Sequence, residues 1–200
     1  NIFLISGADM STSSLPPTPS PVAHRRGAEI ALAVGGFGIG TGEFAIMGLL
    51  PNVAKDPAIS IPQAGHVISV YALGVVIGAP VIATLAARLS RRTLLLLLMV
   101  LFAVGNIASA LSSSYGNLMV FRFISGLPHG AYFGVASLVA ASMAGVGQRA
   151  KAVGRVMLGL TLATLLGSPL ATWIGQLMGW RAAFVMVGVI GALTALLVML

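Results

Sequence analysis

Six long apolar stretches occupy almost the whole chain between Ile30 and Leu200. A stretch of about 20 apolar residues is long enough to cross the hydrocarbon core of a bilayer as a helix. Lipid offers the backbone no hydrogen-bond partners, so each stretch has to satisfy its own N–H and C=O groups and must be helical. The sequence therefore predicts an all-α, polytopic membrane protein. We expect the spans to be Ile30–Leu50, Gly65–Ala86, Thr93–Ala110, Leu118–Met143, Ala152–Leu177 and Ala182–Leu200.

The composition excludes several classes of protein. Only 8% of the residues are charged, whereas soluble domains carry about 25%. The formal net charge of +7 is divided among short gaps and forms no basic face, so we expect no nucleic-acid partner. The chain has no cysteine, and His24, His66 and His129 lie far apart. We therefore expect no metal and no other cofactor.

The basic residues fall in alternate gaps between the spans, which indicates the orientation of the chain. The gaps on one side contain Arg25, Arg26, Arg88, Arg91, Arg92, Arg149, Lys151 and Arg155. The other gaps contain only Lys55, which is followed by Asp56, and Arg181. Because basic loops stay in the cytoplasm, we expect the N-terminus to be cytoplasmic.

The first 28 residues differ from the rest. Ser11–Pro21 is rich in Ser, Thr and Pro, which favours a disordered tail over residues 1–28. Met10 is a candidate start, in which case residues 1–9 would not be native. Asn1–Ala8 is too short for a signal peptide and has no basic leader.

Glu43 is the only acidic residue within the expected spans, about 13 residues into the first helix and so near the membrane midplane. A charge there costs at least ~2.5–3.5 kcal/mol, so the side chain must face protein or water, or be protonated. Glu43 is our candidate proton carrier. Its alternative role is that of a structural acid bonded to a neighbouring helix.

The fourth span contributes two further candidates. Arg122 lies one turn into that span, where it can line a polar cavity and bias a nearby carboxyl, or extend to the outer interface. His129 lies two turns further along, and it is either a proton-relay residue or a packed, hydrogen-bonded histidine.

Small residues form a ridge along the fifth span. Gly159, Ala163, Gly167, Ala171 and Gly175 recur at four-residue spacing, and Pro169 is expected to bend the helix. Small residues let helix backbones approach closely, so this ridge predicts a packing face.

Four segments resemble the N-terminal half of a major facilitator superfamily transporter, in the bacterial drug/proton antiporter branch. They are Thr41–Phe44 with Gly48–Pro51, the loop Leu85–Arg92, Arg122–Gly126 with Pro128–Gly130, and Gly159 to Gly175. Ala87 and Ser90 replace the aspartate and the second glycine of the family's loop motif, although Arg88, Arg91 and Arg92 remain. In the helix-five motif, Ser168 separates the Gly and Pro that are adjacent in the family.

The resemblance implies twelve helices in two halves, with alternating access to a substrate site between them. This chain would be the first half, truncated in or just after helix six. It would belong to a proton-coupled exporter of drugs or sugars in a bacterial inner membrane. Glu43, Arg122 and His129 would line the cavity, and the helix-five ridge of Gly159, Gly167, Pro169 and Gly175 would pack against the missing half.

Two other functions remain open at this point. The first is a non-transporting six-helix scaffold that dimerises through its glycine-rich faces. The second is an intramembrane enzyme, but the sequence shows neither paired acids nor a nucleophile beside a base.

Overall fold

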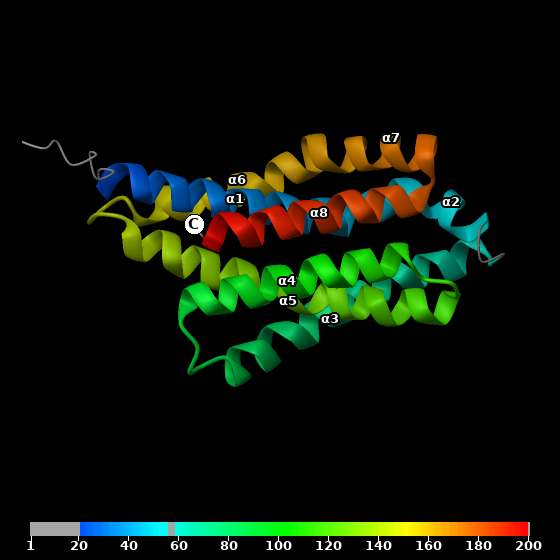
Figure 1. Cartoon of the computed structure of the whole chain (residues 1–200), viewed down its shortest axis with the longest axis horizontal. Coiled ribbons are helices and arrows are strands. Elements are labelled where there is room, and N and C mark those ends of the chain that lie inside the picture. Colours follow the sequence, from blue (N-terminus) through cyan, green and yellow to red (C-terminus); the bar gives the residue numbers. More distant parts are fainter. Residues whose placement is uncertain (1–20, 56–58, 200) are drawn as a thin grey trace, which may run out of the picture.

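The computed structural model describes residues 21–55 and 59–199, and this part of the chain is almost entirely helical. Figure 1 shows a bundle of long helices that run roughly along one axis. The helices are α1 (Pro21–Phe44), α2 (Leu50–Lys55), α3 (Ile61–Leu85), α4 (Arg91–Ala110), α5 (Tyr115–Met143), α6 (Arg149–Leu162), α7 (Ser168–Met178) and α8 (Trp180–Met199). A 3-10 segment, Ala45–Leu49, joins α1 to α2, and a π-helical segment, Ala163–Gly167, joins α6 to α7.

The described residues contain six helical spans that are long and apolar enough to cross a membrane. Helix α1 continues through α2 as one span, and α6 continues through α7 as another. The six spans predicted from the sequence are therefore confirmed. Helix α1 begins at Pro21, so residues 21–28 are helical and do not belong to the expected tail. The rest of that tail, residues 1–20, lies outside the described residues.

Serine caps explain why three helices begin earlier than the apolar stretches alone predict. Ser60 accepts a hydrogen bond from the Gln63 amide of α3, and the Gln63 side chain accepts one from the Ser60 amide. Ser90 and Ser114 cap α4 and α5 in the same position. A serine at this position satisfies an N–H group that the first helical turn leaves without a partner.

Helices α3 and α5 cross at backbone contact. A side chain on Gly74 would collide with the carbonyl oxygen of Phe123, and one on Gly126 with that of Tyr71. Helix α4 packs against α5 and α8, and α1 packs against α6 and α8. Two groups of helices result, with α1, α6, α7 and α8 on one side and α3, α4 and α5 on the other (Figure 1).

The small-residue ridge of the fifth span packs against the first span. A Cβ atom on Gly159 would meet the Ala33 carbonyl oxygen, and one on Gly167 would meet Thr41 Oγ1. Gly175 faces Leu49, whose Cδ1 would lie 2.7 Å from an added Cβ. The expectation that this ridge packs against a missing half is therefore wrong. Its period identified the packing face but did not identify the partner.

The bend expected at Pro169 takes the form of the π-helical segment that ends at Gly167. Proline has no N–H to donate to the residue four positions earlier, which here is Leu165. The wider π turn falls where that hydrogen bond is lost.

The basic gaps lie at one end of the bundle. The start of α1, the α3–α4 turn and the α5–α6 turn all lie toward that end (Figure 1). Arg88, Arg91 and Arg92 are exposed. Arg92 donates to the carbonyl oxygens of Val198 and Met199, the former at 3.1 Å from Nε. The loop motif thus ties the start of α4 to the last turn of α8.

Candidate functional site

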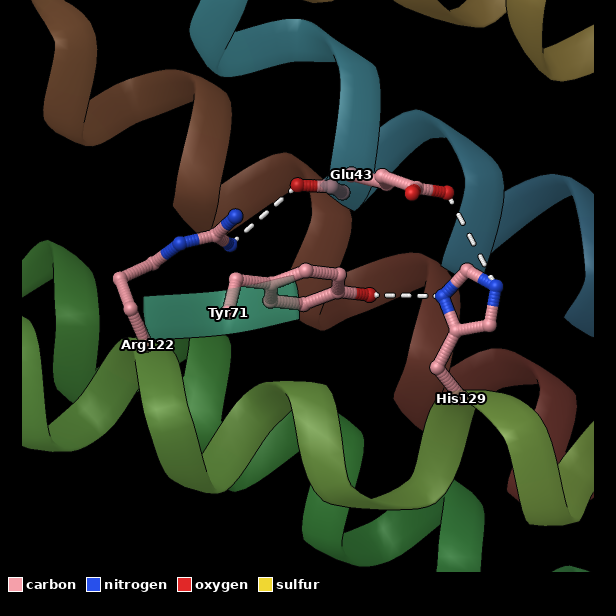
Figure 2. Close-up of polar contacts among 5 residues, drawn as sticks. Glu43, Tyr71, Arg122 and His129 are labelled. Carbon is pink, nitrogen blue, oxygen red and sulfur yellow. Dashed lines mark hydrogen bonds and ion pairs between the residues drawn. The ribbon is translucent and has the colours of Figure 1, made fainter. Parts of the chain in front are cut away.

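The structure brings the three candidate residues of the first and fourth spans together. Glu43 lies in the last turn of α1, near the middle of its span. Arg122 and His129 lie on one face of α5, because seven residues make about two helical turns. Tyr71, on α3, lies between the Arg122 and His129 side chains (Figure 2).

His129 is the centre of this cluster. Its Nε2 lies 3.8 Å from Oε2 of Glu43, which is ion-pair range but too long for a hydrogen bond. Its Nδ1 is hydrogen-bonded to the Tyr71 hydroxyl at 3.1 Å. The His129 side chain is 13% exposed and that of Glu43 is 30% exposed. The acid is therefore the more accessible member of the pair, from which a proton can leave or arrive.

Arg122 is completely buried. Its guanidinium stacks on the Tyr71 ring, 4.2 Å from the centroid, and lies 5.2 Å from that of Phe184. Nη1 donates to the Gly42 carbonyl oxygen at 3.2 Å (Figure 2). Nε and Nη2 have no hydrogen-bond partner within the described residues. Arg122 therefore points between the helices, and the alternative in which it extends to the outer interface is wrong.

Glycines set the distances within this cluster. Gly126 lies between Arg122 and His129, and the absence of a side chain there lets the Tyr71 backbone touch α5. On α1, an added Cβ on Gly42 would lie 2.9 Å from Val187 Cγ1 and 3.0 Å from Phe102 Cζ. The close approach of α1 to α4 and α8 places the Gly42 carbonyl within reach of Arg122. The glycines beside the charged residues thus have a geometric role.

A cavity of about 680 Å³ lies elsewhere, between α1 and α6. Its polar lining includes Glu29 and Arg155, which pair at 2.7 Å between Nε and Oε2 and at 3.0 Å between Nη2 and Oε1. Glu43, Arg122 and His129 do not line this cavity.

Two residues of the polar interior were missed by the sequence analysis. Glu29 is 7% exposed and lies within the first span as the structure defines it, so Glu43 is not the only acid there. Its partner Arg155 lies 126 residues away in the sequence, so the pairing becomes visible only in the structure. Tyr71 carries a polar hydroxyl near the middle of a largely apolar span, and this was the available signal.

The arrangement is suited to the transfer of a proton between neighbouring side chains. A carboxyl, an imidazole and a phenol are in sequential contact beside a fixed guanidinium, near the middle of a membrane span. Among the described residues, no group of three or more His, Cys, Asp or Glu side chains is placed to hold a metal ion.

Curated relatives match most of this chain. The inner membrane transport protein YdhP of Escherichia coli is 46% identical over 165 residues, and the putative transporter AraJ is 47% identical over 160 residues. A chloramphenicol resistance protein of Streptomyces lividans is 34% identical over 153 residues. These matches cover 82%, 80% and 76% of this chain, but 42%, 41% and 39% of the relatives. The chain thus spans less than half the length of the relatives it matches.

Solved structures share the fold at low sequence identity. A proton:xylose symporter, XylE, superposes with a TM-score of 0.78 at 17% identity, covering 90% of this chain and 45% of the symporter. A bacterial homologue of the human lysosomal transporter Spinster gives a TM-score of 0.77 at 20% identity, covering 88% of this chain and 42% of that one.

The sequence profile described as Major Facilitator Superfamily matches residues 32–200. Its members are transporters and not enzymes. From the matched profile, the six spans and the relatives, we conclude that this chain belongs to the major facilitator superfamily.

Proposed function

We propose that this chain is the N-terminal half of a proton-coupled exporter of small molecules in a bacterial inner membrane, with its N-terminus in the cytoplasm. The observation that carries the proposal is the contact of Glu43 with His129 near the middle of a membrane span, next to buried Arg122. Coupling requires a group that takes up and releases a proton at membrane depth, and Glu43 is the accessible carboxyl of this cluster.

Export is favoured by the chloramphenicol resistance relative, since resistance is the outcome expected of a protein that removes a drug from the cell. The inner-membrane location follows that of the Escherichia coli relative. The substrate site is proposed to lie between this half and a second six-helix half, because the relatives are more than twice as long as the matched segment.

The fixed charge of Arg122 supports a coupling role. A buried guanidinium with two nitrogens lacking partners is costly unless another interaction compensates. Its positive charge compensates part of the negative charge that Glu43 acquires when its proton leaves. A substrate that approaches Glu43 would compete with that proton.

The rival scaffold function loses its main support in the structure. It required free glycine-rich faces for dimerisation. Gly74, Gly126 and Gly159, on α3, α5 and α6, are occupied by contacts inside this half, whereas Gly134 and Gly154 have open space at the Cβ position.

The test is transport by the full-length protein in everted membrane vesicles under an imposed proton gradient, with radiolabelled chloramphenicol as the first probe. We expect uptake by the wild type, partial uptake by Glu43→Asp and loss of gradient-driven uptake in Glu43→Gln. Glutamine keeps the size of glutamate and can still form hydrogen bonds, but its amide cannot take up and release a proton as a carboxyl does.

Glu29→Gln is the matched control, because it makes the same change on the same helix in an acid paired with Arg155. We expect it to lower the amount of inserted protein and to leave gradient-driven uptake per inserted molecule intact. Wild-type uptake in Glu43→Gln at equal expression would contradict the proposal.

A further inference from the structure

Tyr71 contacts both charge-bearing residues of α5. It is 1% exposed and lies on α3. Its ring face supports the Arg122 guanidinium at 4.2 Å, and its hydroxyl is 3.1 Å from Nδ1 of His129. Figure 2 shows the ring between the two side chains, with the hydroxyl directed at the imidazole. A single buried side chain from a neighbouring helix thus fixes two groups of the cluster at once.

The direction of the Tyr71–His129 hydrogen bond follows from what lies on the other side of the imidazole. A neutral imidazole has one nitrogen that donates and one that accepts. When Glu43 is ionised, its carboxylate only accepts and attracts an N–H group, so Nε2, which faces it, is then the nitrogen that carries the proton. Nδ1 is then the acceptor, and the Tyr71 hydroxyl must donate to it.

We infer that Tyr71 is a positioning residue of the coupling cluster: its hydroxyl holds His129 in the tautomer whose Nε2–H faces the Glu43 carboxylate. This inference rests on the proposed function of Glu43. It adds a role for a residue of the second span. Without the hydroxyl, the imidazole can flip or change tautomer. The nitrogen that faces Glu43 is then no longer fixed as the one that carries the proton.

The position of Tyr71 also separates Arg122 from His129. Arg122 and a protonated His129 would lie on one face of α5, and their charges would repel each other. The Tyr71 ring fills the space next to the guanidinium and offers its π face to it, which is a favourable contact for a desolvated cation. Among the described residues, two polar groups face His129. They are the Glu43 carboxyl from α1 and the titratable Tyr71 hydroxyl from α3.

Tyr71→Phe removes the hydroxyl and keeps the ring that stacks on Arg122. Tyr132→Phe is the matched control on α5. Tyr132 is also fully buried, and its hydroxyl donates to the Leu32 carbonyl oxygen at 2.9 Å. Both variants lose one buried tyrosine hydrogen bond, but only Tyr71→Phe affects His129.

The first readout is the side-chain ¹⁵N spectrum of His129 in the full-length protein in lipid, assigned by comparison with His129→Gln. We expect the wild type to show a protonated Nε2 and a hydrogen-bonded, unprotonated Nδ1. Tyr71→Phe should lose the Nδ1 hydrogen-bond shift, and Tyr132→Phe should keep it. A proton on Nδ1 in the wild type, or a His129 spectrum unchanged by Tyr71→Phe, would overturn the inference.

The second readout is gradient-driven uptake of chloramphenicol into everted vesicles. We expect Tyr71→Phe to lower the rate roughly fivefold, the factor that corresponds to one neutral hydrogen bond. In a His129→Gln background, Tyr71→Phe should cause no further loss, because the hydroxyl acts through His129. Additive losses, or an equal loss in Tyr132→Phe, would show a structural role only.

The two proposals can fail separately. If Glu43→Gln abolishes uptake while Tyr71→Phe changes neither the spectrum nor the rate, the positioning role falls and the coupling role of Glu43 stands. If Glu43→Gln transports as the wild type does, the coupling role falls, whatever the His129 spectrum shows.

Discussion

Arg122 is a residue whose burial is costly for the fold, which supports a role in the proposed function. The guanidinium is fully buried, is bonded to the Gly42 carbonyl oxygen through Nη1, and stacks on Tyr71. No carboxylate forms an ion pair with it among the described residues. A cation buried in this way is weak evidence for a stabilising role. Its charge beside Glu43 is the feature that a coupling mechanism can use.

We therefore expect Arg122→Met in the full-length protein to be at least as heat-stable as the wild type and to lose gradient-driven uptake. Methionine fills a similar space and needs no hydrogen bonds. Arg122→Lys should keep part of the uptake, because an ammonium retains the positive charge but lacks the planar face that stacks on Tyr71.

The measurements are the thermal unfolding midpoint in detergent and the uptake rate at equal expression. A large fall in the unfolding midpoint of Arg122→Met would indicate that Arg122 is mainly structural.

At the scale of the elements, the fifth span is held against the first by its small residues. Gly167 lies against Thr41 and Phe37, with an added Cβ 3.1 Å from Phe37 Cε2. Leu165, two residues earlier, is 67% exposed. One helix thus has a face that tolerates no bulk and another face that is open.

Gly167→Leu should separate α1 from the fifth span and displace Glu43, which follows Thr41 by two residues. We expect it to impair uptake severely, whereas Leu165→Ala should leave uptake near the wild-type level. The check is the uptake rate of the two variants after expression has been matched. Normal uptake in Gly167→Leu would show that the ridge is not closely packed.

The elements also show what the sequence could and could not predict. The six spans followed from apolar length, because the bilayer imposes a minimum length on a helix. The packing face of helix five followed from its four-residue period, but its partner did not, since a period carries no information about the neighbouring helix. Glu43, Arg122 and His129 were identified as polar residues in an apolar context. Tyr71 was not, because its role depends on contacts with α5 that the sequence does not show.

For the whole molecule, the described helices form six spans whose basic turns lie at one end. At that end Arg155 pairs with Glu29, and Arg92 bonds to the last turn of α8. Long-range contacts thus join the start of α1 to α6 and the start of α4 to the end of α8. We expect this end to face the cytoplasm, since basic loops are retained there.

The chain has no cysteine, so single cysteines in an otherwise cysteine-free version of the full-length protein can test that orientation. Ser90→Cys, in the basic α3–α4 turn, should resist an impermeant thiol reagent in intact cells and react once the membrane is opened. Ser113→Cys, in the α4–α5 turn, is the matched control and should react in intact cells. The reverse pattern would invert the topology.

The central claim is that Glu43 takes up and releases a proton within the membrane. The most direct measurement is the infrared difference spectrum of the full-length protein in lipid between acidic and alkaline pH. We predict a carboxylic-acid band that is present at acidic pH, lost at alkaline pH, absent from Glu43→Gln and retained in Glu29→Gln. Identical difference spectra for the wild type and Glu43→Gln would contradict the claim, because Glu43 would then keep one protonation state throughout.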